Sequence, residues 1–253
     1  MSKNYLKKLH YRFIILLNTF RILKKYNSIL KVLIFFLKKK KKSPVIINYR
    51  NYKLKIRAGP TDIHTLEQNL NDEFTILKKY FNRYDKLKIL DAGGFIGFSA
   101  LKFNEMFPAA KIYLFEPSSD NFEILKFNVG KKKNIKIFNA ALSNFSGYSN
   151  LFDYNYGPAS YTLGFKKGNI KSKSSVKIFD INTILKKFKF IDVLKLDVEG
   201  EEYKILNYKF NFKKVKFIFL EIHKNKNKLK FLKFLKTKKN ILRVPKSEKY
   251  LLY

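Results

Sequence analysis

Short apolar runs alternate with longer amphipathic stretches from Lys86 to the C-terminus. The runs predict strands at 87–91, 111–115, 134–138, 191–196 and 216–221, and the stretches predict helices at 97–106, 118–129, 180–187, 200–208 and 225–237. This alternation favours a mostly parallel sheet with helices on both faces. Segments 240–244 and 249–253 predict a closing β-hairpin.

Two regions depart from this alternation. Residues 142–178 are rich in Ser, Gly, Asn and Tyr, which predicts an inserted loop or hairpin with short β-like pieces. Upstream, Val45–Ile56 predicts one or two strands, and Gly59-Pro60 turns the chain. A helix capped by Thr61 or Asp62 is then expected to run to about Tyr80.

The first 61 residues contain no acidic residue, and basic residues interrupt their apolar clusters at 13–17 and 29–37. This pattern predicts one or two basic amphipathic helices, which either lie on an anionic membrane surface through residues 1–42 or pack on the main domain with their lysines in solvent. The chain is thus divided into a basic N-terminal segment, 1–44, lead-in strands and a helix, 45–85, and the main domain, 86–253. We expect a cytoplasmic protein, with peripheral attachment to the inner face of the membrane left open.

The composition limits the chemistry. The 253 residues include no cysteine, which excludes disulfides, a thiolate metal site and a cysteine nucleophile. The formal net charge of +35 suits an anionic partner, but lysine is spread through nearly every segment, as a biased coding sequence would also give. The 19 acidic residues are therefore the more informative ones.

A glycine-rich turn follows the first strand of the main domain. It reads Asp91-Ala-Gly93-Gly94-Phe-Ile-Gly97. A dinucleotide fingerprint fits poorly, since its first glycine falls on Ala92 and the Asp91 carboxylate would repel a pyrophosphate. S-adenosylmethionine carries a sulfonium and an ammonium group, so carboxylates at this turn suit it.

Two further positions follow the next strands. Glu116 ends the second strand, where an acid can accept both ribose hydroxyls, although a surface or helix-capping acid is the alternative. Ala140 follows the third strand, where a small residue would leave room for an adenine ring.

Four acids in six residues follow the fourth strand. Asp197 and Glu199 are placed to act on a substrate hydroxyl, whereas Glu201 and Glu202 are interpreted as favouring a helix N-terminus through its dipole. Glu221 and His223 end the fifth strand, and either could take a proton from a hydroxyl. Asp197 and Glu199 could also hold a divalent cation, but no metal ion is expected.

Together these residues resemble the FkbM family of S-adenosylmethionine-dependent methyltransferases. The resemblance covers roughly residues 45–253 and rests on RAGPTDIHTLEQN (57–69), DAGGFIGFSA (91–100), FEPSSDNFEILKFNV (115–129), NAALSNFSG (139–147), ASYTL (159–163), VKIFDINTIL (176–185), IDVLKLDVEGEEYKIL (191–206) and FLEIH (219–223). One departure is Gly94-Phe95, where many members have Ala-Asn.

The resemblance implies a class I methyltransferase fold, a Rossmann-like seven-stranded sheet. It also implies methyl transfer from S-adenosylmethionine to oxygen, often on a sugar, glycan or other small product. By carry-over, Asp91, Gly93 and Gly97 would contact the methionine part, Glu116 the ribose, and Asp197 the transferring methyl, with Asp197 and His223 as candidate bases.

Two alternatives stay open. An RNA methyltransferase would use the basic surface, but the Asn/Asp-Pro-Pro-Tyr signature of base-methylating enzymes is replaced by Asp-Val-Glu-Gly after the fourth strand, and clustered acids there repel phosphate. A non-enzymatic membrane-associated module would bind no cofactor, yet the glycine turn and its acids are intact.

Overall fold

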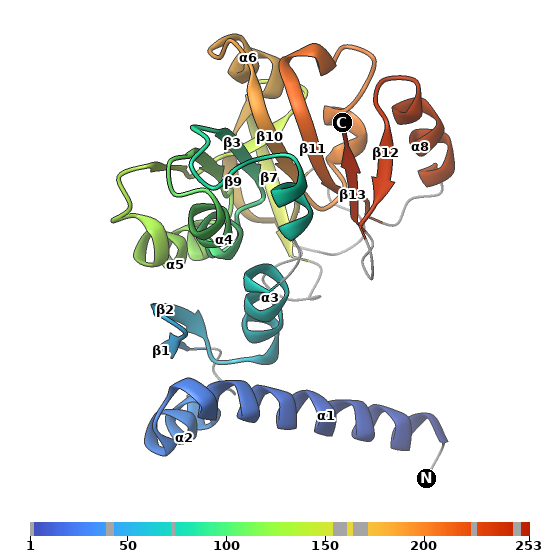
Figure 1. Ribbon diagram of the computed structural model, residues 1–253. Helices are drawn as coiled ribbons and strands as arrows, with labels where there is room; N and C mark the ends of the chain where they lie inside the picture. The colour runs from blue at the N-terminus through green and yellow to red at the C-terminus, as the bar shows by residue number, and fades with distance from the viewer. Residues whose placement is uncertain are drawn as a thin grey trace. The chain divides into compact units, whose positions relative to one another are not determined.

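The computed structural model describes residues 3–38, 43–71, 74–153, 161–163, 172–223, 227–244 and 249–253. The chain forms two compact units, Met1–Asn71 and Asp72–Tyr253 (Figure 1). The division lies upstream of the expected boundary at 85/86 because Phe74 and Phe81 pack into the second unit, against Phe103, Phe219, Phe107 and Phe217.

The first unit begins with two helices, α1 (Lys3–Tyr26) and α2 (Ile29–Lys38), as the sequence predicts. An antiparallel hairpin of β1 (Pro44–Tyr49) and β2 (Tyr52–Arg57) follows. Within the described residues, no helix is both long enough and apolar enough to cross a bilayer.

Helix α3 (Pro60–Leu70) corrects the predicted helix in this region. Its N-cap is Gly59, followed by Pro60, whose fixed φ suits the first helical position. Asp62 is buried and accepts a hydrogen bond from the Arg57 backbone N–H at 2.8 Å instead of capping the helix. The helix ends at Leu70, and a separate 3-10 helix, η2 (Thr75–Lys79), opens the second unit.

The second unit is built on a seven-stranded sheet in the order β12-β13-β11-β10-β3-β4-β5. Its parallel strands are β3 (Lys88–Ala92), β4 (Lys111–Phe115), β5 (Ile135–Phe138), β10 (Ile191–Leu196) and β11 (Val215–Glu221). Strands β12 (Ile241–Arg243) and β13 (Lys249–Leu252) form the expected antiparallel hairpin at one edge. The mostly parallel seven-stranded sheet is therefore confirmed.

Helices cover both faces of this sheet. Helices α6 (Ile181–Lys186), α7 (Glu202–Ile205) and α8 (Lys228–Lys236) contribute to an apolar core with Leu90, Leu194 and Ile218 of the sheet. On the opposite face, Phe74, beside η2, packs on Phe103 of α4 (Phe98–Met106) and on Phe219 of β11. Helix α5 (Ser119–Val129) connects β4 to β5.

The segment predicted as an inserted loop or hairpin forms a separate four-stranded sheet. Its order is β6 (Ala141–Ser143), β9 (Ser172–Asp180), β7 (Gly147–Asp153) and β8 (Tyr161–Leu163). Strand β9 extends this sheet by pairing with both β6 and β7, a long-range contact that local composition does not reveal. Residues 159 and 160 of the ASYTL match lie outside the described residues.

Candidate active site at the carboxyl edge of the sheet

Strand register places Asp91, Lys195 and Glu221 on one face of the sheet. Asp91 of β3 lies opposite Lys195 of β10, and Lys195 lies opposite Phe219 of β11. Because side chains alternate along a strand, Glu221 falls on the same face as Lys195. The face that bears these groups is the one that packs α4.

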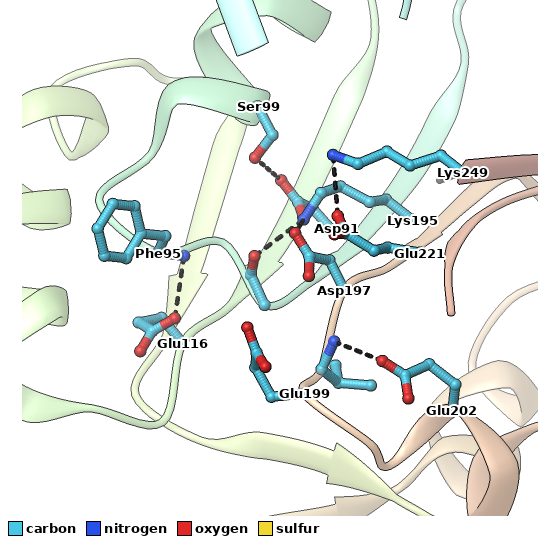
Figure 2. A network of polar contacts seen from close by, with 12 residues as sticks. Asp91, Phe95, Ser99, Glu116, Lys195, Asp197, Glu199, Glu202, Glu221 and Lys249 are labelled. Atoms are coloured by element: carbon cyan, nitrogen blue, oxygen red, sulfur yellow. Dashed lines mark hydrogen bonds and ion pairs between the residues drawn. The ribbon is translucent and has the colours of Figure 1, made fainter. Parts of the chain in front are cut away.

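Lys195 connects the strand ends. Its ammonium nitrogen lies 3.1 Å from Asp91 Oδ1, 3.7 Å from Asp197 Oδ2, and 2.9 Å from the Gly93 carbonyl oxygen, to which it donates a hydrogen bond (Figure 2). Burial opposes the charge on Lys195, but the adjacent Asp91 carboxylate holds its pKa above the ordinary value. The sequence analysis assigns no role to Lys195, although a lysine in an apolar strand is the signal of a paired buried charge.

Asp91 is fully buried. Its Oδ2 accepts a hydrogen bond of 2.5 Å from Ser99 on α4, while Oδ1 faces Lys195. Asp91 thus fixes the start of α4 and the position of Lys195. Its expected direct contact with a cofactor stays a prediction.

The glycine turn brings β3 against the end of β10. Gly93 has φ +81°, and a Cβ at this position would overlap the Asp197 carbonyl oxygen. Gly93 and Gly94 both donate their backbone N–H groups to the Phe115 carbonyl oxygen at 3.0 Å. Gly97, with φ +96°, is the left-handed N-cap of α4. Only glycine allows this close approach together with the positive φ.

Glu116 closes the turn from β4. Its carboxylate accepts hydrogen bonds from the backbone N–H groups of Phe95 and Ser118, both at 2.9 Å, and from Asn121 Nδ2 at 3.1 Å. Burial raises the pKa of Glu116 to about 7, against the lowering effect of these donors. The glycine turn and the acid expected at the ribose therefore lie together, while the ribose contact itself stays a prediction.

Ala140 lies in the apolar core beside Phe115 and Leu142, with 2% of its surface exposed. Its predicted place beside the adenine ring is not tested by this packing. The residue that follows β5 contacts the end of β4: Asn139 Nδ2 donates a hydrogen bond to the Glu116 carbonyl oxygen at 2.9 Å.

His223 lies among the acids that follow β10. Its Nε2 is 3.3 Å from Glu199 Oε2 and 3.9 Å from Asp197 Oδ1, and its Nδ1 is 2.7 Å from Glu202 Oε1. Burial disfavours the charged ring, but the hydrogen bonds to Glu199 and Glu202 outweigh it and raise the pKa of His223 to about 11. His223 is therefore an imidazolium at neutral pH, with both nitrogens directed at carboxylates.

Glu202 is the residue whose role the sequence missed. The sequence predicts only an acid that favours a helix N-terminus, yet the Glu202 side chain is fully buried and pairs with His223. Glu201 is also buried, where it accepts a 2.5 Å hydrogen bond from Ser143 on β6 and pairs with Lys204. Nothing in the sequence separates such inward-facing acids from solvated ones, because α7 is too short to show a periodicity.

Glu221 ends β11 beside Asp197. Burial and the Asp197 charge raise the pKa of Glu221 to about 8. Lys249 of β13 lies 3.0 Å from Glu221 Oε2, and burial lowers the pKa of Lys249 to about 8. The C-terminal hairpin thus supplies a cation to the carboxyl edge, a contact that the sequence analysis did not predict.

Asp197, Glu221 and His223 each offer one ligand atom within 4.8 Å of the others, a spacing that could hold a metal ion. In the described geometry the His223 ring is already engaged by Glu199 and Glu202. A metal at this position would have to displace the His223 proton, so the chemistry below is assigned to the protein groups.

Among the residues that the structure describes, carboxylates outnumber basic groups at this edge, in a chain whose formal net charge is +35. Asp91, Asp197, Glu199, Glu202 and Glu221 gather around Lys195, His223 and Lys249. A negative edge beside a glycine turn fits a cationic nucleoside cofactor and does not fit a pyrophosphate. The order of the parallel strands and this edge define the class as a Rossmann-like, class I methyltransferase.

The family model of the methyltransferase FkbM domain matches residues 91–243, more than half of the chain. The chain therefore belongs to the FkbM methyltransferase family, and it is an S-adenosylmethionine-dependent methyltransferase. No curated protein sequence matches it.

Several solved structures are similar to the chain. A precorrin-6y C5,15-methyltransferase from Geobacter metallireducens is 13% identical, with 70% of this chain and 83% of that chain covered and a TM-score of 0.40. The Methanococcus jannaschii fibrillarin pre-rRNA processing protein is 13% identical, with 83% and 81% covered and a TM-score of 0.43. The N-terminal domain of human METTL16 in complex with SAH is 10% identical, with 88% and 79% covered and a TM-score of 0.37.

Proposed function

We propose that the chain transfers a methyl group from S-adenosylmethionine to a hydroxyl oxygen of a sugar, a glycan or another small biosynthetic product. The observation that carries this proposal is the pair of carboxylates, Asp197 and Glu221, at the ends of the adjacent strands β10 and β11. Carboxylates so placed can orient a hydroxyl group and accept its proton.

Different residues of the edge are assigned to orienting the acceptor hydroxyl and to accepting its proton. The bound cofactor supplies a methyl group on a positively charged sulfur. Asp197, whose side chain is 29% exposed, is assigned to orient the acceptor hydroxyl. Glu221, at the end of the adjacent strand β11, is assigned as the proton acceptor in its ionised form, which its raised pKa makes the main form only above neutral pH.

His223 is assigned a positioning role in place of the predicted base role. An imidazolium held by Glu199 and Glu202 has no lone pair for a hydroxyl proton. It instead fixes the loop that carries Glu199, whose φ of +51° is unusual for a residue other than glycine.

The alternative function is methylation of RNA, which the basic composition favours. Against it stands the negative edge, since the acids that follow β10 would repel a phosphate backbone. The two functions differ in acceptor and in salt dependence, so one assay separates them.

The test is a transfer assay with methyl-labelled S-adenosylmethionine, offering monosaccharides and nucleotide sugars in one series and total RNA in another. We expect label on a sugar oxygen, identified by mass spectrometry. Asp197→Asn should lower turnover by about 100-fold or more and leave cofactor affinity almost unchanged, because Asp197 acts on the acceptor. Asp85→Asn, in the loop before β3, is the matched control. Label on RNA, lost steeply with salt, would overturn the proposal.

A further inference from the structure

The two N-terminal helices leave an apolar surface uncovered within the first unit. Phe20 of α1 and Phe36 of α2 are in contact, with ring centroids 6.5 Å apart. Leu23, Val32 and Phe35 are buried, each with 2% or less of its surface exposed, and form the inner side of this helix pair. Apart from Phe36, the remaining apolar residues of α2 are exposed.

Helix α2 carries its second apolar face at positions 29, 30, 33, 34 and 37. The spacing i, i+1, i+4, i+5 and i+8 puts these residues on one side of the helix, away from Val32 and Phe35. Leu37 is 81% exposed, Leu30 66% and Leu33 54%. Five large aliphatic side chains on one short helix are more than scattered surface residues.

Helix α1 carries exposed apolar residues of its own, with cations beside them. Ile14, Leu17 and Phe20 are about 40% exposed, and Leu17 and Phe20 line a hollow together with Arg21, Lys24 and Lys25. The Lys24 ammonium group lies 5.9 Å from the centroid of the Phe20 ring. Apolar and basic side chains therefore share one part of the surface. We call the exposed apolar residues the docking patch; they are Ile14, Leu17, Phe20, Ile29, Leu30, Leu33, Ile34 and Leu37.

The two helices that carry the docking patch have basic residues and no acidic residue in their sequences. No acidic residue occurs before Asp62, so neither α1 nor α2 contains one. Arg21, Lys24, Lys25 and Lys31 are exposed beside the patch. An apolar face on helices that carry cations and no acidic residue is complementary to a surface that is apolar within and anionic at its boundary.

We propose that α1 and α2 bind the surface of an anionic lipid bilayer. The docking patch enters the boundary of the acyl chains, and the flanking lysine and arginine side chains contact lipid phosphates. Nucleic acid would satisfy the cations but would leave the aliphatic face of α2 in water. The proposal goes beyond methyl transfer and places the chain at the cytoplasmic leaflet, where anionic lipids concentrate.

The test is co-sedimentation of the full chain with vesicles of phosphatidylcholine alone and with about a third phosphatidylglycerol. We expect binding to the anionic vesicles, weakened in about 1 M salt, where the Debye length falls to about 3 Å. The double variant Leu30→Glu, Leu33→Glu should lose binding by about tenfold or more, because two charges would enter the acyl boundary. Both residues are exposed, so the fold should be kept, as circular dichroism and the unfolding midpoint will check.

Leu229→Glu is the matched control, since Leu229 is 77% exposed on α8 of the second unit. It should bind vesicles like the wild-type chain. Two results would overturn the proposal: equal vesicle binding by the double variant, or no vesicle binding by the wild-type chain. In the second case, sedimentation velocity showing a dimer that the double variant dissociates would identify a second copy as the occupant. Cofactor binding is measured separately, so failure here leaves the proposed function standing.

Discussion

Two residues of the site hold backbone conformations that cost free energy. Phe95 and Glu199 have φ near +50°, in the left-handed region that residues with a Cβ rarely adopt. Each is held by a site contact: the Phe95 N–H donates to Glu116, and the Glu199 carboxylate faces His223. Strain of this kind is maintained where surrounding contacts fix the chain, which fits a preorganised binding edge.

Phe95 is also a residue at which the chain departs from the family pattern. Many members have Asn at this position, and Asn enters the left-handed region more readily than Phe does. Phe95 nevertheless adopts this conformation here, and its backbone N–H donates to Glu116 at 2.9 Å.

The protonation state of His223 is a prediction at this scale. With a pKa of about 11, the ring should stay protonated at pH 8, as nitrogen chemical shifts of labelled histidine will show. Glu202→Gln should lower this pKa by about one unit or more, since it removes the 2.7 Å partner of Nδ1. Glu105→Gln on α4 should leave it in place. A His223 ring that titrates near the ordinary value of about 6.5 in the wild-type chain would contradict the assignment.

The raised pKa of His223 also determines how the free energy of unfolding depends on pH. A pKa raised in the folded state means that folding favours the protonated ring. The stabilisation is therefore complete below a pH of about 6.5, the unfolded value, and is lost as the pH rises toward 11. The Glu202→Gln variant should show a smaller loss over this window.

At the scale of elements, the sequence predicted the parallel strands and their neighbours well. Each strand is an apolar run that ends in a short polar motif, and a mostly parallel sheet then limits the strand order. The order β11-β10-β3-β4 brought together Asp91, Glu116, Asp197 and His223 at one edge, as the motifs implied. Element ends were less predictable, as α3 shows, because they depend on contacts such as Arg57 with Asp62.

The sequence does not predict in which direction individual side chains point. Glu202 and Glu199 are three residues apart in one acidic motif, and both bind the same histidine from opposite nitrogens. Asp91 begins the glycine turn but is enclosed by Ser99 and Lys195. Such differences arise from the register between strands and from burial, which a linear motif does not encode.

Phe74 packs the η2 segment against the sheet. Truncating its side chain tests whether this segment belongs to the second unit. Phe74 is fully buried, with ring centroids 4.5 Å from Phe103 and 4.9 Å from Phe219. Phe74→Ala should lower the free energy of unfolding by about 3–5 kcal/mol, measured by denaturant titration. Tyr84→Ala, at a position 76% exposed, should cost much less. A loss below about 1 kcal/mol for Phe74→Ala would mean that this segment is not part of the core.

At the scale of the whole molecule, acidic and basic residues are unevenly distributed. The chain has 54 lysine and arginine residues, yet carboxylates predominate in the described part of the carboxyl edge of the sheet. The net charge alone fits any anionic partner or a biased coding sequence, whereas the location of the acids points to a cationic cofactor. Location was the better guide because screening limits a charge to about 8 Å in physiological salt.

The central claim is that S-adenosylmethionine binds at this edge with its ribose on Glu116, and calorimetric titration of the cofactor tests it most directly. At a pH above the Glu116 pKa of about 7, where this carboxylate is ionised, the wild-type chain should bind, and Glu116→Gln should bind about tenfold or more weakly, because a charge-assisted hydrogen bond to the ribose is lost. Glu123→Gln on the exposed side of α5 should bind like the wild-type chain. An unchanged dissociation constant in Glu116→Gln, or no binding by the wild-type chain, would contradict the account.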